Sequence, residues 1–495
     1  MARTLLARIG LVLTGLLLFL VAALLWPPAN APLPARHASL LIDGARIIDV
    51  ESGTAGDPTR ILVRGGRIAA IAPDLAPPTG AHRVDARGRW LMPGLWDMHS
   101  HSFKVSPQLH LPLQLASGIT AVRDMMGCPE RTDPLLACHA DKRRWSAAAA
   151  AGTMASPRFI ADASFYYEDP SLTPATVKAR VAEDRARGAR LLKVYNNLPL
   201  AAYRTLAGEA QAQGMSLVGH VPKAVPLAEA VARGQRSFEH GRIFIEGCFA
   251  DAARWRAGHY DKLPRPQLIA HMLGARNRAG CEAIMGGMAA RNIAFVPTLV
   301  TREEDARAHD PAYLRDPRLV YADPLSRWAF GDDAAGTAAI YAAPEDRALL
   351  AGVLRQAQAD TLAAHRAGMP VLVGSDTIIA GPKFHDEMGL LVDSGLTPAE
   401  VLRAATLDAA RFAGLDRDYG SVAVGKHADL LLLDADPLAD IGNSRRIAAV
   451  ILGGHLYDRG GVAALLDFVR AQAAHPGNGI RLIWGFLTSP ASADL

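Results

Sequence analysis

The chain has 495 residues, half of them hydrophobic, and lysine and arginine together exceed aspartate and glutamate by only four. This length exceeds one ordinary domain, so two or three structural units are expected. The small charge excess, without a basic run or interleaved basic and aromatic residues, argues against a nucleic-acid partner.

Residues 1–31 differ from the rest of the chain. A basic start, MARTLLAR, precedes about 18 apolar residues, which is typical of an export signal or a membrane anchor. Ala29 and Ala31 form a small-residue cleavage pattern, but Pro32 at the first mature position disfavours cleavage. A cleaved signal peptide and an uncleaved N-terminal anchor both remain open. Either predicts a periplasmic or other extracytoplasmic protein, attached to the membrane if the segment is uncleaved.

Two β-rich blocks frame the body of the chain. Residues 38–92 alternate apolar and polar positions around a Gly65–Gly66 turn, as in short strands and hairpins, and residues 416–460 repeat the pattern. We expect these blocks to form one small β-sandwich domain built from both chain ends. Residues 461–495 contain a helical pattern and a tail.

Strand-like and alanine-rich helical stretches alternate between the two blocks, over residues 93–415. This alternation predicts an α/β fold with a parallel sheet. Eight strand candidates match the inventory of a (β/α)8 TIM barrel inserted between the halves of the β-domain. The candidates are 95–101, 120–125, 158–162, 191–195, 216–221, 237–241, 293–300 and 371–376.

The four cysteines fall into two local groups. Cys128 lies near Cys138, and Cys248 and Cys281 share a later stretch. An oxidising compartment permits disulfides, and four cysteines allow three pairings. We favour the local pairs, 128–138 and 248–281, with free buried thiols as the alternative. No Cys-x-x-Cys pair suggests a thiolate metal site.

Polar residues gather at the ends of the candidate strands. His99 and His101 share one face of the first strand because side chains two apart point the same way. Active-site groups of barrels project from these carboxyl ends, so this spacing suits a two-armed metal ligand. The full set in chain order is His99, His101, Lys193, His220, His240 and Asp376. The long interval before Asp376 predicts insertions around 246–290 and 301–360.

Each of these residues also has an ordinary structural explanation. A lone strand histidine is commonly a hydrogen-bonded core residue, Lys193 could extend its charge toward solvent, and Asp376 could cap a helix. The combination, at strand ends and in this order, is what favours a metal site.

The same residues carry a resemblance to a known family. With MPGLWDMHSH and GSVAVGKHADLLLLDADP around it, the set resembles the metal-dependent amidohydrolase superfamily. TAVRD and the segment Gly395–Leu415 are similar to the imidazolonepropionase-related, prolidase-like (Xaa-Pro dipeptidase-like) branch. The resemblance spans about residues 38 to 460.

The resemblance implies two divalent metal ions, zinc in most members. His99, His101 and Asp376 would bind the first ion, and His220 and His240 the second. Lys193 would be carboxylated by CO2 and bridge them, since a buried lysine has a lowered pKa. A metal-bridging hydroxide would attack an amide carbonyl, with Asp376 as general base and then acid.

Substrate contacts are less well defined by the sequence. Tyr195 shares a strand face with Lys193 and could reach a substrate or pack in the barrel. His385, after the eighth strand, could bind substrate, support the site or lie on the surface. Arg123 and Asp124 are expected to form a buried ion pair under the site.

These observations favour a hydrolase of a small-molecule amide, a dipeptide or an N-acyl amino acid. Cyclic-amide or imidazolone hydrolysis and lactone or organophosphate hydrolysis are alternatives. A non-catalytic, membrane-associated binding module is the alternative outside enzymes. The sequence leaves a homo-oligomer, substrate specificity and metal identity open.

Overall fold

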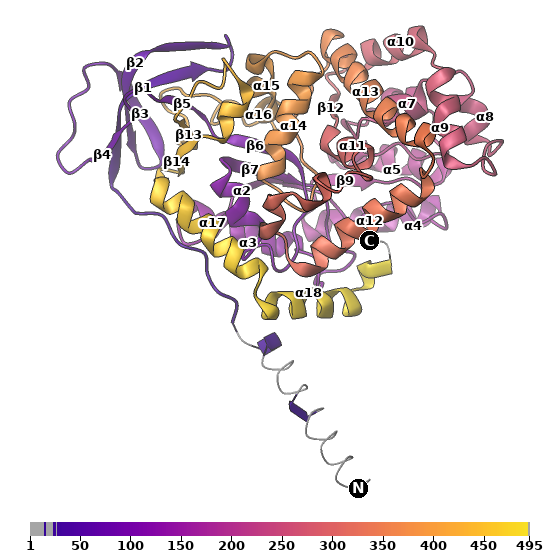
Figure 1. Ribbon diagram of the computed structural model, residues 1–495, viewed down its shortest axis with the longest axis horizontal. Helices are drawn as coiled ribbons and strands as arrows, with labels where there is room; N and C mark the ends of the chain where they lie inside the picture. The colour runs from indigo at the N-terminus through magenta and orange to yellow at the C-terminus, as the bar shows by residue number, and fades with distance from the viewer. Residues whose placement is uncertain (1–13, 16–22, 26, 494–495) are drawn as a thin grey trace.

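The computed structural model describes residues 14–15, 23–25 and 27–493 (Figure 1). The predicted export segment, 1–31, falls largely outside these residues. Among the helices of the described part, none has both the length and the apolar composition needed to cross a membrane.

Both ends of the chain contribute to one antiparallel-rich sheet, seen at the left of Figure 1. The order is β15-β14-β13-β5-β1-β2-β3, with β4 paired to β1. The strands are β1 (Ser39–Asp49), β2 (Thr54–Arg64), β3 (Arg67–Ala72), β4 (His82–Asp85), β5 (Trp90–Pro93), β13 (Leu430–Leu433), β14 (Ile447–Leu452) and β15 (His455–Tyr457).

The join between the two chain ends lies where β5 pairs with β13. Leu91 faces Leu432 across this antiparallel ladder, while β5 pairs in parallel with β1 on its other side. Buried aliphatic residues from both ends form the core against this sheet, among them Leu40, Leu91 and Leu430. The contribution of both ends is as predicted, but the predicted β-sandwich is not confirmed, because the strands form a single eight-stranded sheet.

Seven parallel strands form two further sheets. β6 (Leu95–Ser100), β7 (Ile119–Asp124) and β8 (Arg158–Asp162) make one, and β9 (Leu191–Val194), β10 (Ser216–Gly219), β11 (Ser237–Glu239) and β12 (Ala294–Val296) make the other. All residues of β6, β7 and β9 are buried, as expected for strands covered on both faces.

The predicted eighth strand is present only as a hydrogen-bonded segment, 371–376. Leu372 donates to Phe295 of β12, and Val373 accepts from Met98 of β6. Isolated bridges, such as Ala163 with Leu191, join β8 to β9. The fold is therefore mixed α/β with parallel sheets, and the described residues do not form one continuous closed barrel, because two junctions have only isolated backbone contacts.

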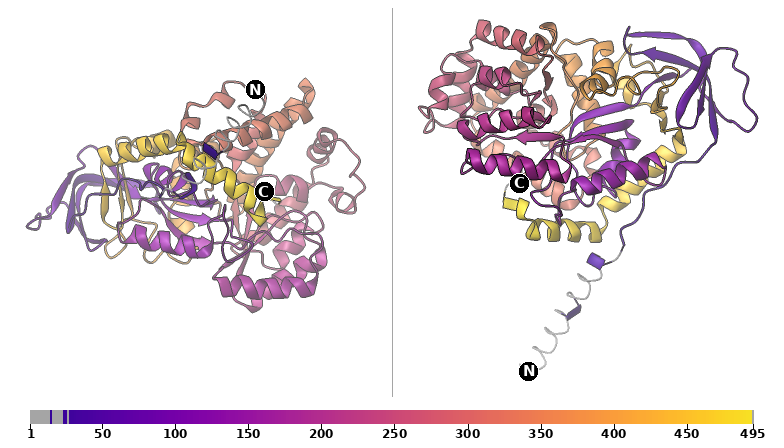
Figure 2. Two further views of the ribbon diagram at one scale, coloured as in Figure 1. Left: turned by 90° about the horizontal axis from the view of Figure 1, so that it is seen from below. Right: turned by 180° about the vertical axis from the view of Figure 1, so that it is seen from behind.

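Helices follow the parallel strands in the expected alternation and surround them (Figure 2). The helices of the body are α2 (His110–Ala116), α3 (His139–Ala150), α4 (Pro174–Arg187), α5 (Leu200–Ala212), α6 (Leu227–Ala232), α14 (Pro382–Asp393), α15 (Pro398–Ala404) and α16 (Leu407–Phe412). Short 3-10 helix η3 (Ile441–Arg445) precedes β14.

Two helical insertions follow β11 and β12, as predicted. The first contains α7 (Ile243–Gly247), α8 (Ala252–Arg256), α9 (Arg265–Gly274) and α10 (Arg278–Ala289). The second contains α11 (Leu299–Ala306), η1 (Tyr313–Arg315), η2 (Pro317–Tyr321), α12 (Pro324–Ile340) and α13 (Pro344–Arg366). The C-terminal region adds α17 (Arg459–Ala473), α18 (Pro476–Thr488) and η4 (Pro490–Ala493).

Both local disulfides are present. Cys128 is bonded to Cys138 in the loop after β7, and Cys248 is bonded to Cys281, which ties the end of α7 to α10. The favoured pairing is confirmed. Each bridge restrains an excursion at the carboxyl end of the strands, where the sequence places the candidate site.

Candidate metal centre

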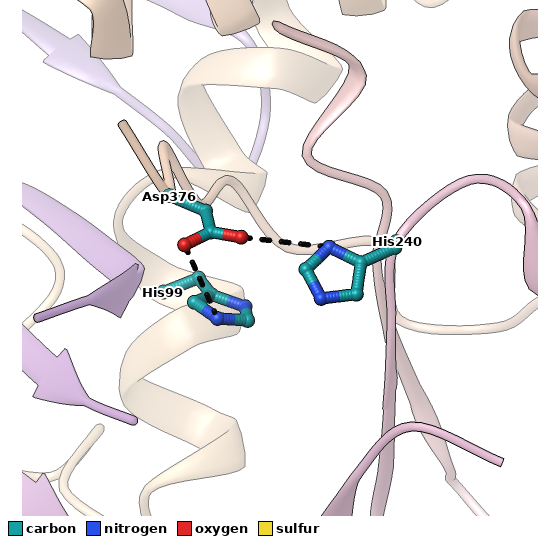
Figure 3. Close-up of side chains that lie close together, drawn as sticks. All are labelled: His99, His240 and Asp376. Carbon is teal, nitrogen blue, oxygen red and sulfur yellow. Dashed lines mark ion pairs between the residues drawn. The ribbon is translucent and has the colours of Figure 1, made fainter. Parts of the chain in front are cut away.

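The structure brings three predicted donors into one cluster at the carboxyl ends of the parallel strands. One ligand atom from each of His99, His240 and Asp376 lies within 4.8 Å of the others. Figure 3 shows the Asp376 carboxylate between the two imidazoles, with Oδ1 at 3.7 Å from His99 Nε2 and Oδ2 at 3.6 Å from His240 Nδ1. His101 completes this side, with Nε2 at 2.9 Å from Asp376 Oδ1.

The remaining two donors adjoin this cluster. His220 follows β10 directly, and its Nε2 lies 2.8 Å from Nε2 of His240. Lys193, in β9, is 1 % exposed, and its positive charge lowers the pKa of the buried histidines around it. The ends of four strands, β6, β9, β10 and β11, and the segment 371–376 therefore place all six predicted residues around one region.

Strained backbone aims two of the donors. His240 and Asp376 have φ of 73° and 46°, and Thr298, which follows β12, has φ of 43°. Left-handed φ is uncommon for residues with a Cβ and persists where surrounding structure enforces it, often at functional sites. At these three residues the backbone turns away from the strand direction. With regular strand dihedral angles their side chains would not point toward the cluster.

Hydrogen bonds on Nδ1 fix the tautomer of His99 and His220, and the Thr298 hydroxyl beside His240 is compatible with the same tautomer. His99 Nδ1 lies 3.2 Å from Glu239 Oε2, and His220 Nδ1 lies 2.8 Å from Asn196 Oδ1. His240 Nδ1 lies 2.8 Å from Thr298 Oγ1. A neutral imidazole that donates through Nδ1 carries an unprotonated Nε2, the form that binds metals.

The donors fit a divalent cation. Burial lowers the pKa of His220 and His240 well below the ordinary value, and the neighbouring charges of His240 and His99 add to this, so both rings are neutral. Nε2 of His220 and Nε2 of His240 lie 2.8 Å apart, so both can bind one cation when each ring carries its proton on Nδ1. Nδ1 of His101 is buried and without a hydrogen-bond partner among the described residues. Imidazole and carboxylate donors are those that zinc and similar ions prefer.

Comparison with known proteins agrees with this donor set. The model of the amidohydrolase family matches residues 273–457. The imidazolonepropionase of Rubrobacter xylanophilus is 26% identical over 81% of this chain and 92% of its own length. Over these stretches the chain is similar to proteins of the amidohydrolase family.

Two solved structures share the fold across most of the chain. A putative prolidase from Bifidobacterium longum has a TM-score of 0.60 at 23% identity, covering 88% of this chain and 100% of that one. Bottromycin amidohydrolase has a TM-score of 0.67 at 24% identity, covering 92% and 93%. The match to the dihydroorotase of Anaeromyxobacter sp. (strain K), at 35% identity, spans only 23% of this chain and 27% of that enzyme.

The buried carboxylate of Glu239, which the sequence does not predict as part of the site, supports the donor cluster. Glu239 lies between His99 and Arg123, and its oxygens accept from Arg123 at 2.9 and 3.0 Å. Burial would raise the pKa of Glu239, but Arg123 and His99 hold it well below its ordinary value, so it stays ionised. The only signal in the sequence is an acidic residue inside an apolar strand, immediately before His240.

Arg123 and Asp124 do not pair with each other, contrary to the prediction. They are neighbours on β7 and point to opposite faces of the sheet. Arg123 pairs with Glu239 on one face, while Asp124 accepts from Lys142 at 2.7 Å on the other. The predicted Arg123–Asp124 ion pair is therefore wrong, because neighbouring residues of a strand point to opposite faces of the sheet.

Other missed residues orient the predicted ligands from outside the cluster. Asn196 and Thr298 bond to ligand imidazoles, as above, and the buried Asp97 accepts from Ser375 beside Asp376. Single Asn, Thr and Ser residues carry no distinctive sequence pattern, so only coordinates identify them.

Tyr195 lies beside the centre, as the strand spacing predicts. Its half-buried ring is 4.0 Å from the His220 ring, centroid to centroid, and stacks on Tyr166 at 4.8 Å. Tyr166 also lines a cavity of about 920 Å³ whose wall includes Asn197 and Arg180. The aromatic pair thus separates the histidine cluster from a substantial cavity.

His385 has a different environment from the predicted surface or substrate position. It is 5 % exposed within α14, and its ring nitrogens contact Ser444 Oγ at 2.8 Å and the carbonyl oxygen of Ser117 at 3.0 Å. Both nitrogens are engaged, so neither is available to a substrate. His385 instead connects α14 to η3 and to the end of α2.

Glu239→Gln should lower the free energy of unfolding by about 3–5 kcal/mol, because it leaves the buried Arg123 guanidinium without a counter-charge. The matched control is Glu229→Gln, which removes an acid paired with Arg204 at the surface and should change stability by less than about 1 kcal/mol. Urea unfolding of both variants measures the difference. Equal, small losses would contradict the role given to Glu239.

His385 makes stability depend on pH. Burial lowers the pKa of His385 to about 3, so the unfolded chain, with a histidine pKa near 6.5, takes up the proton first on acidification. Stability is therefore lost as pH falls below about 6.5, by about 2 kcal/mol at about pH 5 from this residue.

The variant His385→Gln should show a smaller loss of stability between pH 7 and pH 5 by about this amount. Thr205→Ala, at a half-buried position on α5, removes no titratable group and is the control that should keep the wild-type pH dependence. Unfolding is measured in chelator so that metal loss does not contribute. An unchanged slope in His385→Gln would refute the assignment.

Proposed function

We propose that this protein is a metal-dependent hydrolase of carbon–nitrogen bonds that cleaves the amide of a dipeptide or an N-acyl amino acid. The observation that carries the proposal is the convergence of His99, His220 and His240, each held through Nδ1 so that Nε2 is free for a metal. The similarity to the amidohydrolase family over residues 273–457 supports the same reaction class.

A closed barrel is the simplest framework for this centre. Segment 371–376 bonds to β12 on one side and to β6 on the other, where Asp376 N donates to the His99 carbonyl oxygen at 2.9 Å. We propose that the two parallel sheets are arcs of one irregular (β/α)8 barrel spanning residues 93–415. The β-domain halves are then 38–92 and 416–460, with 1–31 as the export or anchoring segment and 461–495 as a helical tail.

His99, His101 and Asp376 would hold one divalent ion, His220 and His240 a second, and Lys193 would lie between them. Such ions, zinc by donor preference, lower the pKa of water and polarise a carbonyl group when bound. Burial lowers the pKa of Lys193 to about 8, with the carboxylates of Glu239 and Asp376 opposing the shift. A neutral amine is then accessible near pH 7 and could react with CO2 to give a carbamate, an anionic oxygen donor.

Asp376 is suited to carry the proton during hydrolysis. Burial opposes its ionisation, but His99 and His101 hold its pKa well below the ordinary value. The ionised carboxylate can accept a proton from the attacking water and return it to the leaving amine nitrogen. Its left-handed φ of 46° keeps it directed at the imidazoles rather than along the strand.

Tyr195 and Tyr166 would form one wall for the substrate. Their stack runs from His220 to the cavity of about 920 Å³, a volume within the range of small-molecule sites. His385 has both ring nitrogens engaged by Ser444 and Ser117, so the proposal relies on Tyr195 for the substrate contact.

A second candidate activity is the opening of a cyclic amide. It is favoured by the imidazolonepropionase match, which extends over 81% of this chain. Both activities use the same centre and differ in the shape of the amide that reaches it.

Turnover of a panel of dipeptides, N-acyl amino acids, cyclic amides and lactones by zinc-supplemented protein tests the proposal. We expect release of a free amine or amino acid, lost on metal removal by chelator and restored by added metal. Ring opening without release of a second product would select the cyclic-amide alternative. Activity on lactones alone, or no metal bound after supplementation, would overturn the proposal.

Asp376→Asn should lower turnover by at least about a hundredfold, the effect of losing a proton carrier, while much of the metal remains bound. Lys193→Ala should lose both metal and turnover, with partial rescue by small carboxylic acids. Asp434→Asn, in an ion pair of the terminal sheet, is the control and should leave both unchanged. Metal content and turnover are measured together; near-normal turnover in Asp376→Asn would refute its role.

A further inference from the structure

The C-terminal helix α18 presents an apolar face to solvent. Four of its side chains are exposed although they are large and hydrophobic: Ile483 at 49 %, Trp484 at 53 %, Phe486 at 46 % and Leu487 at 74 %. Arg481 is its only charged residue, and it contains no aspartate or glutamate. A soluble surface helix ordinarily places charged residues on this face.

The opposite face of α18 fixes the helix to the body. Gly485 packs directly on the chain at Leu135, where an added Cβ would come within 3.1 Å of backbone. Ser489 Oγ donates to Asp133 at 2.7 Å, and Asn478 Nδ2 donates to Gln472. The apolar side chains are therefore held outward by a well-packed helix rather than exposed by fraying.

The same side of the molecule collects further apolar groups. α12 packs against α18 and adds Trp328, which is 65 % exposed. The described residues 23–25 lie beside the start of α18 in every view of Figures 1 and 2, and Leu25 is 78 % exposed. Six of the ten exposed large hydrophobics in the described residues thus belong to α18, Trp328 and Leu25.

The route of the chain leads the apolar N-terminal sequence to this side. Gln108 Nε2 donates to the Ala29 carbonyl oxygen at 3.2 Å, and Ala31 packs against the main core. These contacts fix the course of residues 29–31, which follow the basic and apolar N-terminal sequence in the chain. A membrane bound by that sequence would lie on the side of the body where residues 23–25 and α18 are found.

We propose that α18 is an interfacial helix that rests on the membrane holding the N-terminal segment. Helices in this role carry Trp, Phe and Leu on the buried face, and Trp favours the headgroup level. α18 carries no acidic side chain that anionic lipid headgroups would repel. The proposal goes beyond the hydrolase assignment and is independent of it, since no residue of the metal centre takes part.

The test places a spin label at single engineered cysteines in the full-length protein, reconstituted in vesicles of phosphatidylcholine and phosphatidylglycerol. The four native cysteines are occupied in disulfides, so the label reports only the new site. Leu487→Cys and Ile483→Cys probe α18. Val424→Cys, 61 % exposed in the terminal β-domain, is the matched control.

We expect labels on α18 to favour collision with oxygen over a water-soluble nickel chelate by about tenfold relative to Val424, because oxygen partitions into lipid and the chelate does not. Replacing Trp484 and Leu487 together by serine should return the Ile483 label to the control value. This change should alter stability by less than about 0.5 kcal/mol, since both side chains are exposed.

Equal aqueous accessibility at α18 and Val424 in vesicles would overturn the proposal. So would spin–spin coupling between Leu487 labels with a dimeric mass in detergent, which would identify a second copy of the chain as the occupant. Protection from the chelate that persists in detergent monomers would show that the N-terminal segment of the same chain covers the helix, and would also overturn it.

Discussion

The buried carboxylate of Glu239 is the interaction on which the geometry of the site depends. It ends β11, accepts two bonds from Arg123 of β7, and contacts Nδ1 of His99 on β6. Arg123 in turn donates to the Met98 carbonyl oxygen at 2.6 Å. Arg123 has an exposed fraction of 0 %, and its buried charge is stable only because Glu239 neutralises it. This ion pair therefore holds β6, β7 and β11 in a fixed register relative to one another.

Close backbone approach makes the donors converge. An added Cβ at Gly374 would lie 2.8 Å from His99 Cβ, and one at Gly219 would lie 2.4 Å from the Val194 carbonyl oxygen. Segment 371–376 can therefore approach β6, and β10 can approach β9, only with glycine at these positions. The left-handed residues His240 and Asp376 follow within two residues of a strand end or of such a glycine, where the chain must turn sharply toward the cluster.

Sequence periodicity predicted the positions of the parallel strands because buried strands are short apolar runs separated by helical pattern, and seven of eight candidates are strands. The candidate ligands could be predicted because metal-binding side chains of such folds lie at strand ends with fixed spacing, as do His99 and His101. Partners across the sheet could not be found this way. Arg123 was matched to its sequence neighbour Asp124, since choosing Glu239 requires knowing which strands face each other. The location of His385 failed for the same reason, because helix packing decides it.

Alternation of apolar and polar residues shows that each terminal strand has one buried face. It does not show whether the strands form one sheet or two, and this is why the sandwich prediction is not confirmed. The contacts that join the two parallel sheets could not be predicted from the sequence either, because isolated backbone hydrogen bonds leave no pattern in the side chains. The spacing of the four cysteines predicted their pairing correctly. Cysteines that are close in sequence can pair because closing a short loop costs little conformational entropy.

The pairing of β5 with β13 also dictates an order of events during translation. Strand β5 joins β1 on one side, but its other edge has no partner until β13 emerges, after roughly 340 more residues. At a ribosomal rate of ~5–20 residues per second the unpaired edge persists for roughly 20–70 s. During that interval the nascent chain exposes an unpaired strand edge that can pair with the wrong strand. The cell must therefore keep the early strands apart from other chains until β13 is made.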